Sequence, residues 1–196
     1  MSSSQPAALL GRLPNPKSGT VQEVHIPKRK YLMVDGSAEL GGRDYQNAVK
    51  GLYSHAYAIK FLPKSGVVVP GYEQFSVQPL EGLYQESDPT RNWTLLIPVP
   101  DFVTDQTIRL ARAELRRKKK DVDDDVRLAD WEQGEVIQTL HLGPYDKEQP
   151  AVDLLHRYAD AHGLTLTGRQ NEIYLNDPGR VAPEKIKVII RYQVQK

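Results

Sequence analysis

The hydrophobic pattern of the first half of this chain switches between the two-residue period of a strand and the 3.6-residue period of a helix. Residues 31–34 form a short apolar run that ends at a turn, and from Asp44 the apolar residues recur at helical spacing until Pro63. Alternating stretches follow at residues 75–84 and 93–99. This order predicts one β-α-β-β unit.

The second half repeats the same order. It predicts a strand at residues 136–142, a helix that starts at about Asp146 and stops at Gly163, and strands at 171–175 and 186–194. The apolar residues of the last strand share one face, so we expect its other face to be half exposed. The sequence leaves the oligomeric state undecided. If the last strand lay at a sheet edge, its unpaired backbone groups could pair with a second copy of the chain and form a homodimer.

The repeated order predicts an α+β fold of duplicated β-α-β-β modules. We expect antiparallel or mixed sheets with the helices on one face and a ligand cleft between the modules. The predicted boundaries are a loose N-terminal arm at 1–22 and a single domain at 23–196. Within that domain, module one spans about 28–103, a helix and charged linker 104–127, and module two about 128–196.

Composition excludes several classes of function. The chain has 196 residues and no cysteine, which excludes disulfides, thiolate metal sites and cysteine nucleophiles. Its 26 basic and 25 acidic residues leave a net charge of +1, so no global field attracts nucleic acid or an anionic membrane. The histidines lack metal-ligand spacing, and the acidic run from Asp121 has Val126 where a calcium loop needs glycine. We therefore expect a cytoplasmic protein with no metal and no cofactor.

The strongest candidate for chemistry is the predicted strand at 171–175. Strand alternation puts Glu172 and Tyr174 on one face, roughly 6.7 Å apart, while Ile173 and Leu175 face the module core. A carboxylate beside an aromatic face suits a cationic or polarised planar ligand, and a desolvated carboxylate can act as a general acid or base near neutral pH. The alternative interpretation is an ordinary glutamate on an exposed strand face.

Glu81, with Tyr84 three residues later, is the corresponding candidate in the first half. Pseudo-symmetry between the modules would bring Glu81 and Glu172 into one cleft, although Glu81 alone reads as a surface residue at a strand end. Trp93 and Tyr145 add aromatic surface, and for Trp93 a core position and a pocket wall are both open.

Several motifs, taken in order, resemble those of the GyrI-like small-molecule-binding proteins, and in particular their stand-alone two-module members. The stretches that carry the resemblance cover residues 53–61, 79–84, 140–145, 172–178 and 182–185. The resemblance implies paired modules of the SHS2 type around a pocket lined by aromatic residues, with Glu172 contacting cationic or planar ligands. This chain departs from the family pattern at Asn171, where relatives often carry histidine, and at Tyr84, where they often carry tryptophan.

The resemblance also implies an activity. Certain stand-alone relatives look like hydrolases that open the strained cyclopropane of DNA-alkylating natural products. By that likeness Glu172 would orient or activate water, Glu81 would be a second pocket carboxylate, and Trp93, Tyr84 and Tyr174 would sandwich a planar ligand. The alternative function is a protein-interaction module that regulates or sequesters a partner such as a topoisomerase, without catalysis. It would present an exposed apolar patch instead of a pocket.

Overall fold

A single antiparallel sheet connects both halves of the molecule, in the strand order β1-β6-β8-β7-β3-β4-β2-β5. The computed structural model describes residues 15–37, 39–85, 92–120 and 125–196. Most of the predicted arm, the loop at 86–91 and most of the acidic run lie outside the described residues. The strands are β1 (Gln22–Ile26), β2 (Arg29–Ser37), β3 (Glu81–Tyr84), β4 (Asn92–Val99), β5 (Arg127–Trp131), β6 (Gly134–Leu142), β7 (Thr165–Tyr174) and β8 (Lys187–Gln195).

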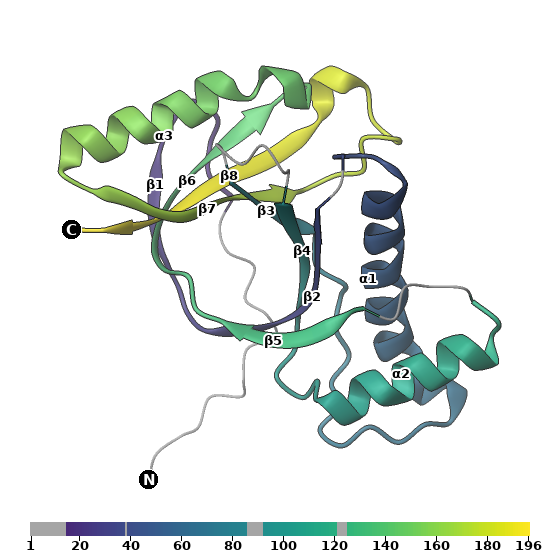
Figure 1. The fold of residues 1–196 in the computed structure, drawn as a ribbon. Helices are drawn as coiled ribbons and strands as arrows, with labels where there is room; N and C mark the ends of the chain where they lie inside the picture. The colour runs from purple at the N-terminus through teal and green to yellow at the C-terminus, as the bar shows by residue number, and fades with distance from the viewer. Residues whose placement is uncertain (1–14, 38, 86–91, 121–124) are drawn as a thin grey trace, which may run out of the picture.

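The helices cover one face of this sheet, which we call the outer face. They are α1 (Arg43–Phe61), α2 (Asp105–Arg117) and α3 (Gln149–His162), with 3-10 turns η1 (Leu62–Ser65), η2 (Tyr145–Lys147) and η3 (Pro183–Lys185). Figure 1 shows the sheet curling, with α1 and α3 outside the curl over different strands. The order β2-α1-β3-β4 is followed by β6-α3-β7-β8, so the predicted α+β fold with a repeated β-α-β-β order is confirmed. The module boundaries remain a prediction.

Each helix forms because its apolar residues share one face. Leu52, Ala56 and Ile59 of α1 are fully buried against the outer face of β2 and β4. α2 begins at a capping box in which Thr104 accepts a hydrogen bond from the backbone N–H of Thr107. α3 ends at Gly163, which has a left-handed φ of 63°. Among the described residues, no helix is long and apolar enough to cross a membrane.

Three predictions about strands were wrong or incomplete. Only Glu81–Tyr84 of the predicted strand at 75–84 forms a ladder. The short edge strands β1 and β5 were not predicted, because their patterns are brief and partly polar. The last strand is buried on both faces, since β8 lies between β6 and β7 and its Ile189 is 4% exposed. The edge that a dimer through β8 would need is therefore occupied.

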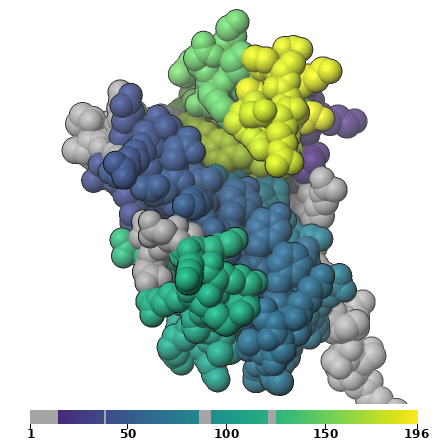
Figure 2. Space-filling view, turned by 90° about the vertical axis from the view of Figure 1, so that its right-hand side faces the viewer, coloured from purple at the N-terminus to yellow at the C-terminus, as the bar shows by residue number. Residues whose placement is uncertain are grey.

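The two modules meet where β3 pairs with β7. The register places Gly82 opposite Glu172 and Glu81 opposite Ile173. Directly opposed residues of an antiparallel pair point to the same face, and neighbours along a strand point to opposite faces. This ladder therefore decides which side chains of the two halves meet. Figure 2 shows the green and yellow α3 and β8 region as an upper lobe above the blue and teal region of α1 and α2.

Candidate functional site

Glu172 lies on the outer face of the sheet at the junction of the two modules. Its side chain is 8% exposed. The Tyr174 hydroxyl donates to Glu172 Oε2 at 2.9 Å, and Gln170 Nε2 donates to Glu172 Oε1 at 2.8 Å. The prediction that Glu172 and Tyr174 share a face is confirmed, and their side chains are in direct contact.

A chain of tyrosine hydroxyls leads from α1 to this carboxylate. The hydroxyls of Tyr45 and Tyr84 lie 2.9 Å apart, and those of Tyr84 and Tyr174 lie 2.7 Å apart. Because the Tyr174 proton is donated to Glu172, the Tyr174 oxygen accepts from Tyr84, which in turn accepts from Tyr45. All these hydroxyl dipoles therefore point toward the ionised form of Glu172.

Gln170 links Glu172 to a second carboxyl group, that of Glu148. Tyr192 donates its hydroxyl to Gln170 Oε1 at 2.8 Å, which leaves the amide nitrogen to face the carboxyl groups. Gln170 Nε2 lies 3.4 Å from Glu148 Oε1 in addition to its bond with Glu172. Glu148 is the N-cap residue of α3, and its Oε2 is buried without a hydrogen-bond partner among the described residues.

Burial controls the protonation of these groups. Desolvation and the nearby Glu148 raise the pKa of Glu172 to about 7, although its hydrogen bonds to Tyr174 and Gln170 act in the opposite direction. Desolvation also raises the pKa of Glu148, which Gln170 and His141 partly offset. Burial raises the pKa of Tyr45, Tyr84 and Tyr174, so these hydroxyls stay protonated at neutral pH. The site therefore combines a neutral acid or weak base with a set of fixed hydroxyl donors.

Tyr145 places an exposed ring over this cluster. It is 37% exposed and meets the Tyr174 ring edge to face, with the ring centroids 5.9 Å apart. Two surface hollows lie elsewhere. One of about 400 Å³ lies between α1 and α2 and includes Tyr57 and Lys118, and one of about 330 Å³ lies beside the end of α3 at Asp160. Neither hollow includes Glu172.

Glu81 lies on the opposite, inner face of the sheet, so the expectation that it shares a cleft with Glu172 was wrong. The register pairs Gly82, not Glu81, with Glu172. Glu81 accepts a hydrogen bond from Asn171 Nδ2 at 3.1 Å and lies near the buried Arg191. Burial raises the pKa of Glu81, while Arg191 and Asn171 lower it in part. Asn171, one of the departures from the family pattern, therefore also points away from Glu172.

The inner face carries a polar network of its own. Arg191 donates to Gln138 Oε1 through Nε and Nη2 and to Gln133 Oε1 through Nη1 at 3.2 Å. Gln133, from the connection between β5 and β6, also donates to the hydroxyl of Tyr31 at 3.2 Å. These contacts connect strands from both halves through side chains, and they explain why polar residues are tolerated there.

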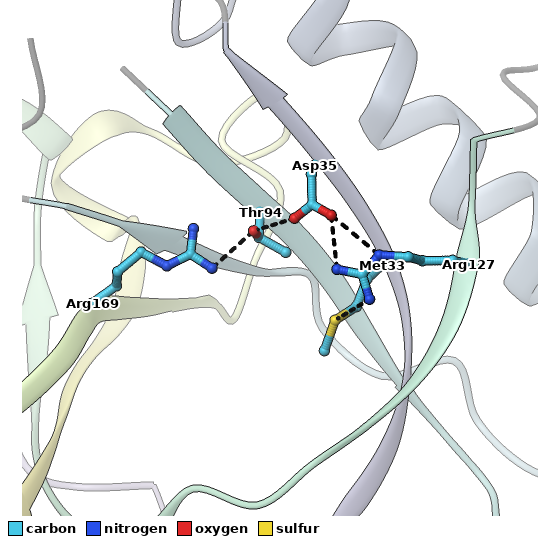
Figure 3. A network of polar contacts seen from close by, with 5 residues as sticks. All are labelled: Met33, Asp35, Thr94, Arg127 and Arg169. Carbon is cyan, nitrogen blue, oxygen red and sulfur yellow. Dashed lines mark hydrogen bonds and ion pairs between the residues drawn. The ribbon is translucent and has the colours of Figure 1, made fainter. Parts of the chain in front are cut away.

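A second inner-face network ties β2, β4, β5 and β7 together, as Figure 3 shows. Asp35 accepts from Thr94 at 2.5 Å and from Arg127 at 2.8 Å, and Arg169 donates to Thr94 at 2.9 Å. Arg127 also lies 3.5 Å from the sulfur of Met33. The contacts of this network are among side chains of the protein, and we assign it a structural role.

Trp93 lies in the core beneath α1. It is 3% exposed, its ring covers Gly36, and Tyr45 meets it edge to face at 5.3 Å. Of the predicted site residues, the structure thus brings together Tyr84, Tyr145, Glu172 and Tyr174, with Trp93 in the layer behind Tyr45. Sequence reasoning missed Glu148 and Gln170; it identified Tyr45 as a source of aromatic surface but did not place it among the site residues. An acidic residue at the start of a predicted helix was the one available signal, and it is also typical of ordinary helix stabilisation.

Comparisons with known proteins agree with this fold. The family model described as the GyrI-like small molecule binding domain matches residues 101–194. The solved structure of a hydrolase from Listeria innocua is 36% identical in sequence, with a TM-score of 0.86. The match covers 94% of this chain and 94% of the Listeria innocua chain. The chain belongs to the GyrI-like family. It therefore carries a GyrI-like small-molecule-binding domain.

Other GyrI-like structures extend the comparison. A second Listeria innocua hydrolase is 32% identical, with 93% of this chain and 100% of that chain covered and a TM-score of 0.85. The EcmrR C-terminal domain is 13% identical over 90% of this chain and 98% of its own, with a TM-score of 0.59, and shows the shared fold. No curated protein matches this chain.

Proposed function

We propose that this protein binds planar, apolar or positively charged small molecules at the tyrosine and carboxyl cluster around Glu172. The observation that carries the proposal is a buried carboxyl group surrounded by aromatic rings at the junction of the modules. Aromatic faces and a desolvated carboxylate both attract positive charge, and the rings supply the apolar surface for a flat ligand. The family of this chain is described by small-molecule binding, which supports the proposal.

Access to the cluster depends on Tyr145. Its exposed ring contacts Tyr174, and its position in the 3-10 turn η2 leaves it at the protein surface. A ligand that reaches Glu172 displaces the Tyr145 ring, which then stacks on the ligand. Tyr84 and Tyr174 provide the opposite wall.

Hydrolysis of reactive ligands is the second candidate function. It is favoured by a carboxyl group with a pKa of about 7, near the value that general base catalysis requires, and by likeness to Listeria innocua proteins described as hydrolases. For a cyclopropane conjugated to a carbonyl group, Glu172 would take a proton from water as the water oxygen bonds to a ring carbon. The ring C–C bond breaks, its electron pair moves to the carbonyl oxygen, and that oxygen takes up a proton.

The experiment is a thermal-shift titration with the planar cation 10-methylacridinium, using wild type, Glu172→Gln and Glu81→Gln. We expect the dye to stabilise wild type and Glu81→Gln alike, because Glu81 faces the other side of the sheet. We expect Glu172→Gln to weaken binding about tenfold, equivalent to ~1.4 kcal/mol. Equal binding by all three proteins would contradict the assignment of the site, and absence of binding would favour a protein partner.

Catalysis is tested separately with a cyclopropane-containing alkylating agent. Mass spectrometry of the reaction with wild type should show a product heavier by one water, and Glu172→Gln should form it more slowly. Saturable binding without this product would support a binding protein that is not an enzyme.

A further inference from the structure

The side-chain amide of Gln170 joins the carboxyl groups of Glu148 and Glu172. The amide cannot turn its oxygen toward either carboxyl group without breaking its hydrogen bond with Tyr192. Gln170 Oε1 accepts from Tyr192, so its Nε2 group presents both hydrogens to the two carboxyl groups. Glu148 comes from the start of α3 and Glu172 from the middle of the sheet. Gln170, which Tyr192 holds in place, therefore keeps Glu148 and Glu172 together as a pair.

We propose that Glu148 is a second functional carboxyl group of this site, and that the Glu148–Glu172 pair holds one proton which it releases when a cationic ligand binds. This inference rests on the proposed ligand site and adds to it a residue, a charge and a proton. The structure gives each member of the pair a distinct part.

Glu172 is the member that holds the proton. It is the more deeply buried of the two, and Glu148 raises its pKa by placing a negative charge nearby. Desolvation raises the pKa of Glu148 as well, but Glu148 is the less buried of the two. Gln170, His141 and the N-terminus of α3 all favour its anion, so we assign the negative charge of the pair to it. With one proton, the pair carries a single negative charge.

The other titratable groups around the pair are four tyrosines, one histidine and one aspartate. Tyr84 from β3, Tyr45 from α1, Tyr174 from β7 and Tyr145 from η2 have raised pKa values and stay neutral. His141 from β6 faces Glu148, and its Nε2 lies 2.9 Å from the carbonyl oxygen of Pro144. Asp177 adds to the negative field at Tyr145, but it is not among the groups that shift the pKa of Glu172 or Glu148.

One oxygen of the pair lacks a hydrogen-bond partner among the described residues. This oxygen is Glu148 Oε2, which is buried and has therefore lost its hydration without a replacement from these residues. A cation beside it would restore the lost interaction and lower the pKa of Glu172 through its charge. The Glu172 proton then leaves to solvent, and the pair gains the second negative charge.

The pair is tested first in the free protein, by ¹³C NMR titration of the glutamate carboxyl carbons. We expect Glu148→Gln to lower the midpoint of Glu172 by one pH unit or more, as removal of a neighbouring negative charge requires. The exposed Glu184→Gln is the matched control and should leave the midpoint unchanged. An unchanged midpoint in Glu148→Gln would overturn the pair.

Proton release is tested by calorimetry of 10-methylacridinium binding at pH 7 in buffers that differ in ionisation enthalpy. We expect wild type to release close to half a proton per dye, because Glu172 is half protonated there. Glu148→Gln should still bind the dye, since ionised Glu172 keeps one negative charge, but should release less than half as much. Equal release by the two proteins, or none by wild type, would overturn the coupling.

Failure of the proposed function has a different signature. If no protein binds the dye while Glu148→Gln still shifts the Glu172 midpoint, the ligand site and the release on binding are both wrong and the pair itself stands. Acridine at pH 8, where it is uncharged, separates the contribution of ligand charge. Binding of acridine as tight as that of 10-methylacridinium would contradict selection for positive charge.

Discussion

Gly82 lies directly across the β3–β7 ladder from Glu172, on the same face of the sheet. The ring of Tyr84 covers Gly82, and a Cβ atom there would collide with the Tyr84 hydroxyl and ring. The missing side chain thus lets Tyr84 lie flat across the ladder and reach the Tyr174 hydroxyl at 2.7 Å. A glycine on one module therefore shapes the carboxyl site of the other.

Substitution of that glycine should disrupt the hydroxyl chain. We expect Gly82→Ala to lower the free energy of unfolding by about 1–3 kcal/mol, because Tyr84 must move to admit the methyl group. Urea denaturation measures the loss. In a double-mutant cycle with Tyr84→Ala, the combined loss should be smaller than the sum of the single losses, and strict additivity would contradict the contact.

Glu172 should make stability depend on pH. Its pKa is raised from 4.5 to about 7 in the folded protein, so the folded state holds a proton that the unfolded chain has lost between these values. The stabilisation is fully present below pH 4.5 and is lost as the pH rises through 7. At about 1.4 kcal/mol per pKa unit, roughly 3 kcal/mol is lost.

Glu172→Gln cannot lose a proton, so it should become more stable relative to wild type by that amount between pH 4.5 and pH 8. Urea denaturation at several pH values measures the difference, and Glu184→Gln serves as the control. A difference that does not change with pH would show that folding does not raise the pKa of Glu172.

The hydroxyl nearest to Glu172 should matter most for its titration. Tyr174→Phe removes a donor that favours the carboxylate, and we expect the pKa of Glu172 to rise above 7. Tyr45→Phe, at the far end of the chain of hydroxyls, should change it much less. ¹³C NMR titration compares the two variants, and equal shifts would rule out an ordered chain.

The inner face should depend on the Glu81–Arg191 pair. Arg191→Met removes the larger of the two cationic influences on the buried Glu81 carboxylate and leaves the smaller one, that of Arg29, and we expect it to cost about 3 kcal/mol in unfolding free energy. Adding Glu81→Gln to Arg191→Met should recover part of that loss, because the poorly compensated charge is then removed. Denaturation of the single and double variants tests this, and no recovery would mean that the lost hydrogen bonds to Gln138 dominate.

Local patterns predicted much of the fold. The helix spacing from Asp44 corresponds to α1, the helix predicted at the start of 104–127 is α2, and Gly163 ends α3 as expected. Such features depend on residues a few positions apart, whose geometry a helix or turn fixes by itself. The shared face of Glu172 and Tyr174 was predictable for the same reason.

The contacts across the modules were not predictable in this way. The sequence suggested that Glu81 and Glu172 would meet, but a one-residue difference in register puts them on opposite faces. Glu148 lies in the site because α3 packs with its start beside Gln170 of β7, and these two residues are 22 positions apart in the chain. Similarly, β8 is an interior strand only because β6 and β7 both pair with it.

By itself the sequence determined the β-α-β-β order of the two halves and the apolar face of each helix, because these follow from the spacing of neighbouring residues. Only the tertiary structure decided which carboxyl group became the partner of Glu172. Strand register and the packing of α3 set the distances between groups far apart in the chain, and those distances control both burial and charge coupling.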